Sequence, residues 1–469
     1  MPHPFDIALK HAKAFRQGVR DRPPRPTISP EEMRARLDGP TPEHGEDGAA
    51  VVEALAAAAD PGIMGIVGPR FFGWVIGGSH EAGVAADWLT SAWGQNAGLY
   101  AGSPAAAVAE ETAGRWLLDI LRLPSNCSVG FVTGATMANF VGIAAARNEM
   151  LRRVGWDVEA KGLYGAPRLR VILGDDAHTT VFAALRFLGF GAATAERIPA
   201  DDQGRMDAGA LERALAAGSD PAIVVAQAGQ INTGAFDPIA RIAAACRKHG
   251  AWLHVDGAFG LWACAVPELA HLAEGAELAD SWATDGHKWL QLPYDCGIAF
   301  VRDPEAHRRA MTIAASYLPQ VNGEYEPSHY VPELSRRARG FAAWAVLRAL
   351  GRAGVADMVR AHCGFAARLA ERLSREPGVR ILNDVVLNQV IVGFGEGDGE
   401  AQDAATRAVI ARLQEDNACF AGGASWRGRW VMRVSVISGA LTEADIDRLG
   451  DAVIAAWRAV RADTKLLEA

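Results

Sequence analysis

The sequence predicts an α/β protein with a large, mostly parallel sheet, followed by a smaller α+β domain. Short apolar runs alternate with helical segments from residue 129 onward, which is typical of a parallel sheet covered on both faces. Beyond residue 350 the pattern changes to long amphipathic helices and separated strands. Polar and glycine residues follow several of the apolar runs, and ligands of parallel sheets bind beyond those ends.

The N-terminal part is predicted to be helical. Apolar residues recur at helical spacing over 5–19, and the Arg/Pro-rich stretch 20–26 ends that helix. A polar, Pro/Gly-rich connection at 36–50 follows, and two helical stretches lie within 82–122. We expect the N-terminal arm to pack against another surface, such as a second subunit.

The middle of the chain carries the predicted sheet. Strands are expected at 129–133, 169–173, 222–226, 252–255 and 297–301. Helices are expected between them at 135–152, 178–188 and 237–248. This alternation predicts a parallel sheet whose carboxyl ends gather polar side chains at one edge.

The last part is predicted to mix helices and strands. A helix at 354–376 precedes strands at 388–394 and 430–436. A final helix at 443–460 opens at Thr442 with an acid three residues on, a capping-box arrangement.

A chain of 469 residues is too long for one ordinary core and predicts two or three domains. We divide it into an N-terminal arm and helical segment (1–81), a large α/β domain (82–350) and a small C-terminal α+β domain (351–469).

Composition excludes several classes of partner. The net charge of −8 gives no electrostatic reason to expect nucleic acid or an anionic membrane. The six cysteines show no CxxC spacing, so we expect reduced thiols and a cytoplasmic location. A stretch of about 18 uncharged apolar residues does not occur, so no membrane span is expected.

Lys288 and Asp256 are the most informative residues. Asp256 closes an apolar run, and Lys288 follows 32 residues later within Gly286-His287-Lys288-Trp289. A lysine can hold pyridoxal phosphate as a Schiff base, and a carboxylate can keep the pyridine nitrogen protonated so that the ring acts as an electron sink. Taken alone, this tetrapeptide is more typical of an exposed turn.

Three further segments stand at predicted strand ends. Gly134, Ala135 and Thr136 supply a glycine turn and a hydroxyl at a helix start, as phosphate binding requires. His178 follows the next strand, where its ring could lie against a flat cofactor or simply cap a helix. Gln230 lies in a turn that precedes a helix. Each segment alone is equally consistent with a structural role.

In order, these segments resemble the group II pyridoxal-phosphate amino-acid decarboxylases, the family of aromatic-L-amino-acid, histidine and glutamate decarboxylases, over about residues 68–460. The resemblance implies the fold type I, aminotransferase-like architecture. It also implies a homodimer with active sites at the subunit interface and an N-terminal segment that packs across it.

The resemblance assigns roles to these residues. Lys288 would carry the cofactor, and Asp256 would pair with the pyridine nitrogen. Ala258 and His178 would sandwich the ring, with His178 on the substrate side. The phosphate would be held by Ala135, Thr136, His287 and, from the other subunit, Ser335.

Two positions depart from the family pattern. Gln230 occupies a place where relatives often have threonine, which leaves its contact to the ring hydroxyl open. Asp285 replaces a frequent asparagine beside the phosphate. Because a carboxylate repels phosphate, we expect Asp285 to use its backbone or to turn its side chain away.

Tyr317 matches the mobile-loop tyrosine that, in these decarboxylases, delivers a proton to the reacting carbon. Family members with phenylalanine here tend to release aldehydes, so the tyrosine argues for an amine product. Without the family context, a tyrosine packed in a loop is the simpler interpretation.

The substrate pocket is less defined. Trp74 and Tyr100 are available as aromatic walls, and Arg433 either binds a carboxylate or braces the small domain. Gly77 and Gly78 either leave room for a bulky ring or allow close backbone packing.

We therefore predict decarboxylation of an L-amino acid, aromatic slightly ahead of acidic, to the amine and CO2 through a quinonoid intermediate. The alternatives at the same cofactor are transamination, aldol cleavage and oxidative deamination to an aldehyde, because the fold sets only the electron sink. A non-catalytic protein that uses the fold for binding is a third interpretation, against which Lys288, Asp256 and His178 speak.

Overall fold

The computed structural model describes residues 2–313, 325–396 and 399–463. The chain forms two compact units. Unit 1 comprises Met1–Ile76, Ala367–Leu382 and Val390–Ala469, and unit 2 comprises Gly77–Ala366 and Asn383–Gln389. The three-segment division made from the sequence stays a prediction.

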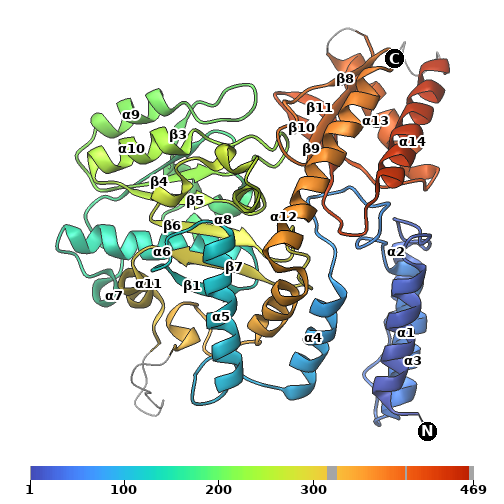
Figure 1. Cartoon of the computed structure of the whole chain (residues 1–469), viewed down its shortest axis with the longest axis horizontal. Helices are drawn as coiled ribbons and strands as arrows, with labels where there is room; N and C mark the ends of the chain where they lie inside the picture. Colours follow the sequence, from blue (N-terminus) through green and yellow to red (C-terminus); the bar gives the residue numbers. More distant parts are fainter. Residues whose placement is uncertain (1, 314–324, 397–398, 464–469) are drawn as a thin grey trace. The chain divides into compact units, whose positions relative to one another are not determined.

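Unit 2 contains a seven-stranded sheet in which only one strand is reversed (Figure 1). In spatial order the strands are β1 (Ser128–Val132), β7 (Gly297–Val301), β6 (Ser281–Asp285), β5 (Trp252–Asp256), β4 (Ala222–Gln227), β2 (Arg170–Gly174) and β3 (Glu196–Ile198). β7 runs antiparallel to both of its neighbours, and the pairs from β6 to β3 are parallel. The predicted, largely parallel α/β sheet is confirmed.

Two of these strands are missing from the sequence prediction. β3 has only three residues at the sheet edge. β6 is completely buried but carries Ser281, Thr284 and Asp285, so it lacks the continuous apolar run of its neighbours. Its polar side chains face other buried groups rather than water, which only the folded sheet reveals.

Helices cover both faces of this sheet. α6 (Ala135–Arg153) packs against β5, β6 and β7, and α10 (Ile239–His249) packs against β4 and β5. Figure 1 shows α6 and α10 on opposite sides of the sheet. The remaining helices of the unit are α4 (Glu81–Trp93), α5 (Pro104–Ile120), α7 (Val158–Lys161), α8 (Thr179–Phe187), α9 (Ala208–Ala216) and α11 (Pro304–Met311).

α12 (Arg339–Ser374) covers most of the helix expected at 354–376 and begins well before it. Gly351 interrupts it with a φ of 62°, a left-handed conformation that glycine adopts without steric cost. Short 3-10 helices occupy Asp60–Gly62, Ala192–Thr194, Gly260–Ala265, Ala270–Ala273, Ala276–Leu278 and Pro327–His329.

Unit 1 joins the N-terminal helices to the C-terminal α+β part. The helices are α1 (Pro4–Gly18), α2 (Pro30–Leu37), α3 (Gly48–Ala59), α13 (Glu400–Glu415) and α14 (Glu443–Ala462). The four-stranded sheet has the order β10 (Gly422–Trp426), β11 (Arg429–Ser435), β9 (Gln389–Phe394) and β8 (Val379–Ile381). α14 opens with the predicted capping box between Thr442 and Asp445. Across the described ranges, no helix is both long and apolar enough to cross a bilayer.

Candidate active site

The carboxyl ends of the parallel strands collect ionisable side chains at one edge of the large sheet. Asp256 ends β5 and Asp285 ends β6. His178 follows β2 and caps α8, where its Nδ1 lies 2.8 Å from the Thr180 hydroxyl. Because parallel strands end at the same edge, residues far apart in sequence meet there. His178 and Lys288 both act electrostatically on Asp256.

Asp256 is a buried carboxylate, 4% exposed, that accepts the Ala258 N–H at 3.2 Å. Burial raises the pKa of Asp256, and the positive charges of His178 and Lys288 oppose that shift. A carboxylate in such a place gains stability from a further cation beside it. The protonated nitrogen of a pyridine ring is a group of that kind.

Lys288 stands in the turn 286–290 directly after β6, and its side chain is 16% exposed. Its Nζ lies 2.8 Å from Asp285 Oδ2. The backbone of Lys288 is fixed by its surroundings, since its carbonyl accepts the Gln291 Nε2–H at 2.9 Å. A Cβ on Gly77 would lie 1.9 Å from the same carbonyl oxygen. Of the two interpretations of this glycine, close backbone packing is therefore confirmed.

The N-terminus of α6 presents backbone N–H groups, one of which binds a carboxylate. Gly134 at its N-cap supplies no side-chain hydrogen bond, and the Ala135 N–H donates to Asp285 Oδ1 at 2.6 Å. Thr136, the second residue of the helix, is half-buried. His287 Nε2 lies 3.4 Å from the same Oδ1, and burial lowers the pKa of His287. The side chain of Asp285 thus faces the helix start and Lys288, whereas we expected either a backbone contact or a side chain turned away from the phosphate.

These observations fit pyridoxal phosphate. The helix start offers N–H groups for a phosphate, the buried Asp256 offers a carboxylate for the pyridine nitrogen, and Lys288 offers a primary amine. Ala258, partly buried, follows Asp256 closely enough for its N–H to bond that carboxylate. The individual roles of these side chains stay predictions.

The side-chain oxygen of Gln230 is hydrogen-bonded within its own turn. Its Oε1 accepts the N–H groups of Asn232 at 2.6 Å and Thr233 at 3.1 Å, and the residue is only 3% exposed. Only the amide nitrogen of this side chain is left to reach a cofactor. The contact that relatives make with a threonine would have to be made by an N–H donor here.

The other predicted residues are placed as follows. Ser335 is exposed, and the Tyr100 N–H donates to Glu326 Oε2 at 2.8 Å. Trp74 and Arg433 belong to unit 1. Trp74 packs edge-on against Phe71 and Phe420, and burial lowers the pKa of Arg433. Tyr317 lies outside the described residues.

Sequence reasoning missed several residues behind the site. Asn139 and His254 are buried beside Asp256, and Gln291 clamps the Lys288 backbone. One signal for His254 exists in the sequence, because it stands two residues before Asp256 and a strand alternates its faces. No such sequence pattern points to Asn139 or Gln291.

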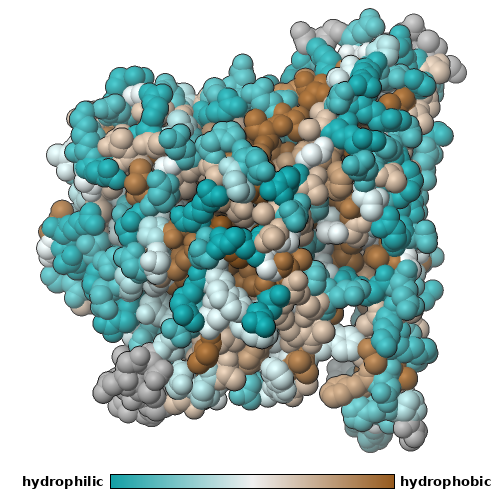
Figure 2. Space-filling model, in the orientation of Figure 1, coloured by the Kyte–Doolittle hydropathy of each residue, from teal (hydrophilic) through white to brown (hydrophobic). Residues whose placement is uncertain are grey.

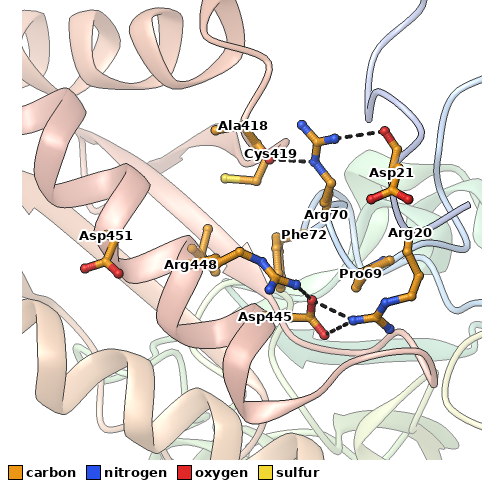
Figure 3. Close-up of a pocket in the computed structure, with 11 residues that line it drawn as sticks. Arg20, Asp21, Pro69, Arg70, Phe72, Ala418, Cys419, Asp445, Arg448 and Asp451 are labelled. Carbon is orange, nitrogen blue, oxygen red and sulfur yellow. Dashed lines mark hydrogen bonds and ion pairs between the residues drawn. The ribbon is translucent and has the colours of Figure 1, made fainter.

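A cavity of 620 Å³ lies within unit 1, and none of the predicted site residues lines it. Figure 3 shows Asp445 there between Arg20 and Arg448. Arg70 donates to the carbonyls of Asp21 at 3.1 Å and Ala418 at 2.8 Å. Of the other acids that line this cavity, Asp451 pairs with Arg372 outside it.

The fold and the edge of the large sheet together define a fold type I pyridoxal-phosphate enzyme. Comparison with known families agrees: the model described as the pyridoxal-dependent decarboxylase conserved domain matches residues 30–394. The chain belongs to this family and is a pyridoxal-phosphate-dependent amino-acid decarboxylase.

Curated relatives and solved structures show the same likeness. Tryptophan decarboxylase 1 of Oryza sativa subsp. japonica is 28% identical over 92% of this chain and 88% of its own length. Aromatic-L-amino-acid decarboxylase of Bacillus atrophaeus is 29% identical over 71% of this chain and 69% of its own. The crystal structure of Oryza sativa TDC with PLP and tryptamine matches with a TM-score of 0.90, at 25% identity over 97% of each chain.

Proposed function

We propose that this enzyme decarboxylates an aromatic L-amino acid to the corresponding amine and CO2. The observation that carries the proposal is the match over 97% of both chains to a structure solved with PLP and tryptamine. Relatives named for tryptophan and for aromatic L-amino acids support the same substrate class.

When bound, pyridoxal phosphate supplies an electron sink for the pair released as the carboxylate leaves. The protein's part is to hold charges and protons in place. Lys288 would provide the amine that attaches the cofactor, and Asp256 would pair as a carboxylate with the pyridine nitrogen. The Ala135 N–H and the Thr136 hydroxyl would hold the phosphate at the start of α6.

Proton delivery falls to two residues in this proposal. His178, held at the start of α8 by its contact with Thr180, would lie against the bound ring on the substrate side. Tyr317, assisted by His178, gives the proton to Cα after CO2 has left. Proton transfer from a positioned side chain contributes about 10²- to 10⁴-fold to a rate.

We further propose a cytoplasmic homodimer whose active sites draw Ser335 from the partner chain. The cysteines are unpaired, as a reducing compartment requires. α1 and α3 of unit 1 pack together yet expose apolar side chains, and Figure 2 shows brown and tan surface among the teal over these helices. The exposed residues are Phe5, Leu9, Val51 and Leu55. Light scattering with size-exclusion chromatography tests the dimer, and a monomeric holoenzyme would contradict it.

The substrate class is tested by incubating holoenzyme with a panel of aromatic, acidic and aliphatic amino acids. CO2, amine, aldehyde and keto acid are measured for each. We expect equimolar CO2 and amine from an aromatic member, with a kcat/KM at least about tenfold above that for glutamate. A preference for glutamate would show that the substrate is acidic rather than aromatic. Keto acid without CO2 would contradict decarboxylation.

The role of Tyr317 is tested by Tyr317→Phe. We expect less amine and more aldehyde from the preferred substrate, because the proton no longer reaches Cα from this residue. Tyr164→Phe is the control, since Tyr164 is 98% exposed. An unchanged ratio of amine to aldehyde would remove Tyr317 from the mechanism.

A further inference from the structure

Alternation along β5 places three side chains on one face of the large sheet. Trp252, His254 and Asp256 occupy every second position of the strand, so their side chains point to the same side of the sheet. α6 packs on this strand and brings Asn139 to that side. Ser281 of β6 is the cross-strand partner of His254.

These side chains form a continuous buried chain of hydrogen bonds. The Trp252 indole Nε1 lies 2.9 Å from Ser281 Oγ, and the same oxygen lies 2.8 Å from His254 Nδ1. His254 Nε2 lies 2.8 Å from Asn139 Oδ1. The Asn139 Nδ2 has no hydrogen-bond partner among the described residues, and the Asn139 amide lowers the pKa of Asp256.

The ends of the chain fix the direction of every link. An indole N–H can only donate, so Ser281 accepts from Trp252 and its own proton is free to go to His254 Nδ1. His254 then carries its proton on Nε2 and donates to Asn139 Oδ1. At the far end an ionised carboxylate can only accept, and the Asn139 N–H is the group turned toward it. Reversing the chain would place an amide oxygen against a carboxylate.

His254 can fill this position only as a neutral ring. It is fully buried, and burial lowers the pKa of His254 to about 3. Space for the ring depends on Gly142, one turn after Asn139, because a Cβ there would lie 2.6 Å from two ring atoms.

We propose that Asn139 and His254 are positioning residues for Asp256: the one-way chain from Trp252 turns an amide N–H toward this carboxylate and orients the carboxylate for the pyridine nitrogen. The inference rests on the role proposed for Asp256. It assigns a function to residues that touch neither the cofactor nor the substrate.

The structure offers a matched control. Ser128 Oγ lies 2.9 Å from His307 Nδ1 in an equally buried serine–histidine pair of the same unit. Burial also lowers the pKa of His307 to about 3. Ser281→Ala and Ser128→Ala therefore remove the same kind of hydrogen bond, but only Ser281 belongs to the chain that reaches Asp256.

The experiment measures the Kd for pyridoxal phosphate by equilibrium dialysis, together with the melting temperature, for Asn139→Ala, Ser281→Ala, Ser128→Ala and Asp256→Asn. We expect Kd to rise about tenfold in Asn139→Ala, the size of a lost hydrogen bond to a charged group. Ser281→Ala should raise it severalfold, and Ser128→Ala should leave it within twofold of wild type. Equal Kd values for the two serine variants would contradict the proposal that the hydrogen-bond chain through Ser281 positions Asp256.

Two further measurements keep the outcomes distinct. If Asp256→Asn binds the cofactor like wild type, the proposed role of Asp256 fails. If it binds weakly while Asn139→Ala binds normally, only the positioning inference fails. ¹⁵N NMR of histidine-labelled holoenzyme reports the tautomer of His254 without any variant that could misfold. A proton on Nε2 supports the proposed direction, and a proton on Nδ1 contradicts it.

Discussion

The edge of the large sheet in unit 2 and the cavity of unit 1 both gather carboxylates among basic side chains, yet they differ in how those charges are satisfied. At the sheet edge, burial raises the pKa of Asp256 despite the nearby positive charges. In the cavity, burial would raise the pKa of Asp445, but hydrogen bonds from Thr442 and Arg20 outweigh it and lower that pKa overall.

The comparison distinguishes a binding site for a charged ligand from a cavity that only offers room. The 620 Å³ cavity has room, but the ion pairs of Asp445 with Arg20 and Arg448 leave little for a ligand to improve. The carboxylate of Asp256 gains from an added cation, and the start of α6 gains from an added anion. Unsatisfied electrostatics, rather than volume, identify where a charged cofactor binds.

The largest expected effect is at Lys288. Lys288→Ala should abolish decarboxylation and the absorbance band near 420 nm, because no other group would hold the aldehyde. Lys248→Ala is the control, since Lys248 forms an exposed ion pair with Glu212. A variant at Lys288 that keeps the band would place the cofactor elsewhere and break the comparison.

The second-largest effect is expected from Gly77→Ala. The added methyl group would overlap the Lys288 carbonyl, so the turn that carries the lysine must move. Overpacking of this kind costs about 1–3 kcal/mol of unfolding free energy, and we expect weaker cofactor binding with it. Urea unfolding and dialysis measure the two effects. Gly364→Ala is the control, because a Cβ there meets no atom within 4 Å.

Asp285→Asn sharpens the electrostatic side of the comparison. The carboxylate of Asp285 accepts the Ala135 N–H at the helix start where a phosphate would bind. Removing its charge should tighten binding of pyridoxal phosphate by about three- to tenfold, since like charges no longer repel there. Weaker binding would instead mean that the carboxylate serves the site through Lys288.

The smallest effect is expected in unit 1. Asp445→Asn should cost about 1 kcal/mol or less, because its partners Arg20 and Arg448 are 47% and 64% exposed, and should leave activity unchanged. Asp445 has a lowered pKa, so its contribution is present above the carboxyl pKa of the unfolded chain and is lost as pH falls through the folded value. Acid unfolding below about pH 4 should therefore be less steep in the variant than in wild type. Lost activity at neutral pH would make the cavity functional after all.

Much of this protein follows from its sequence because the signals are local. The strand ending at Asp256, the helix start at Ala135 and the turn that carries Lys288 are each defined by neighbouring residues. β6 escaped prediction because its polar residues are satisfied only by partners far along the chain.

The same reason explains the residues that were missed. Asn139 lies 115 positions from His254, so only the packing of α6 on β5 brings them together. The unexpected direction of the Asp285 side chain is also non-local, since Ala135 lies 150 positions away. Substrate choice depends on such distant contacts as well, which is why it stays a proposal.

The reversed strand β7 has a consequence for how the chain folds. Ser128 of β1 pairs with Val301 of β7, 173 positions later, and among the described residues β7 is the only strand that pairs with β1. Loop closure over such a distance is slow, and a nascent chain that ends before residue 297 leaves the edges of β1 and β6 unpaired. Fragments truncated in this interval should aggregate unless a chaperone binds them, so this sheet is completed only after the ribosome has passed β7.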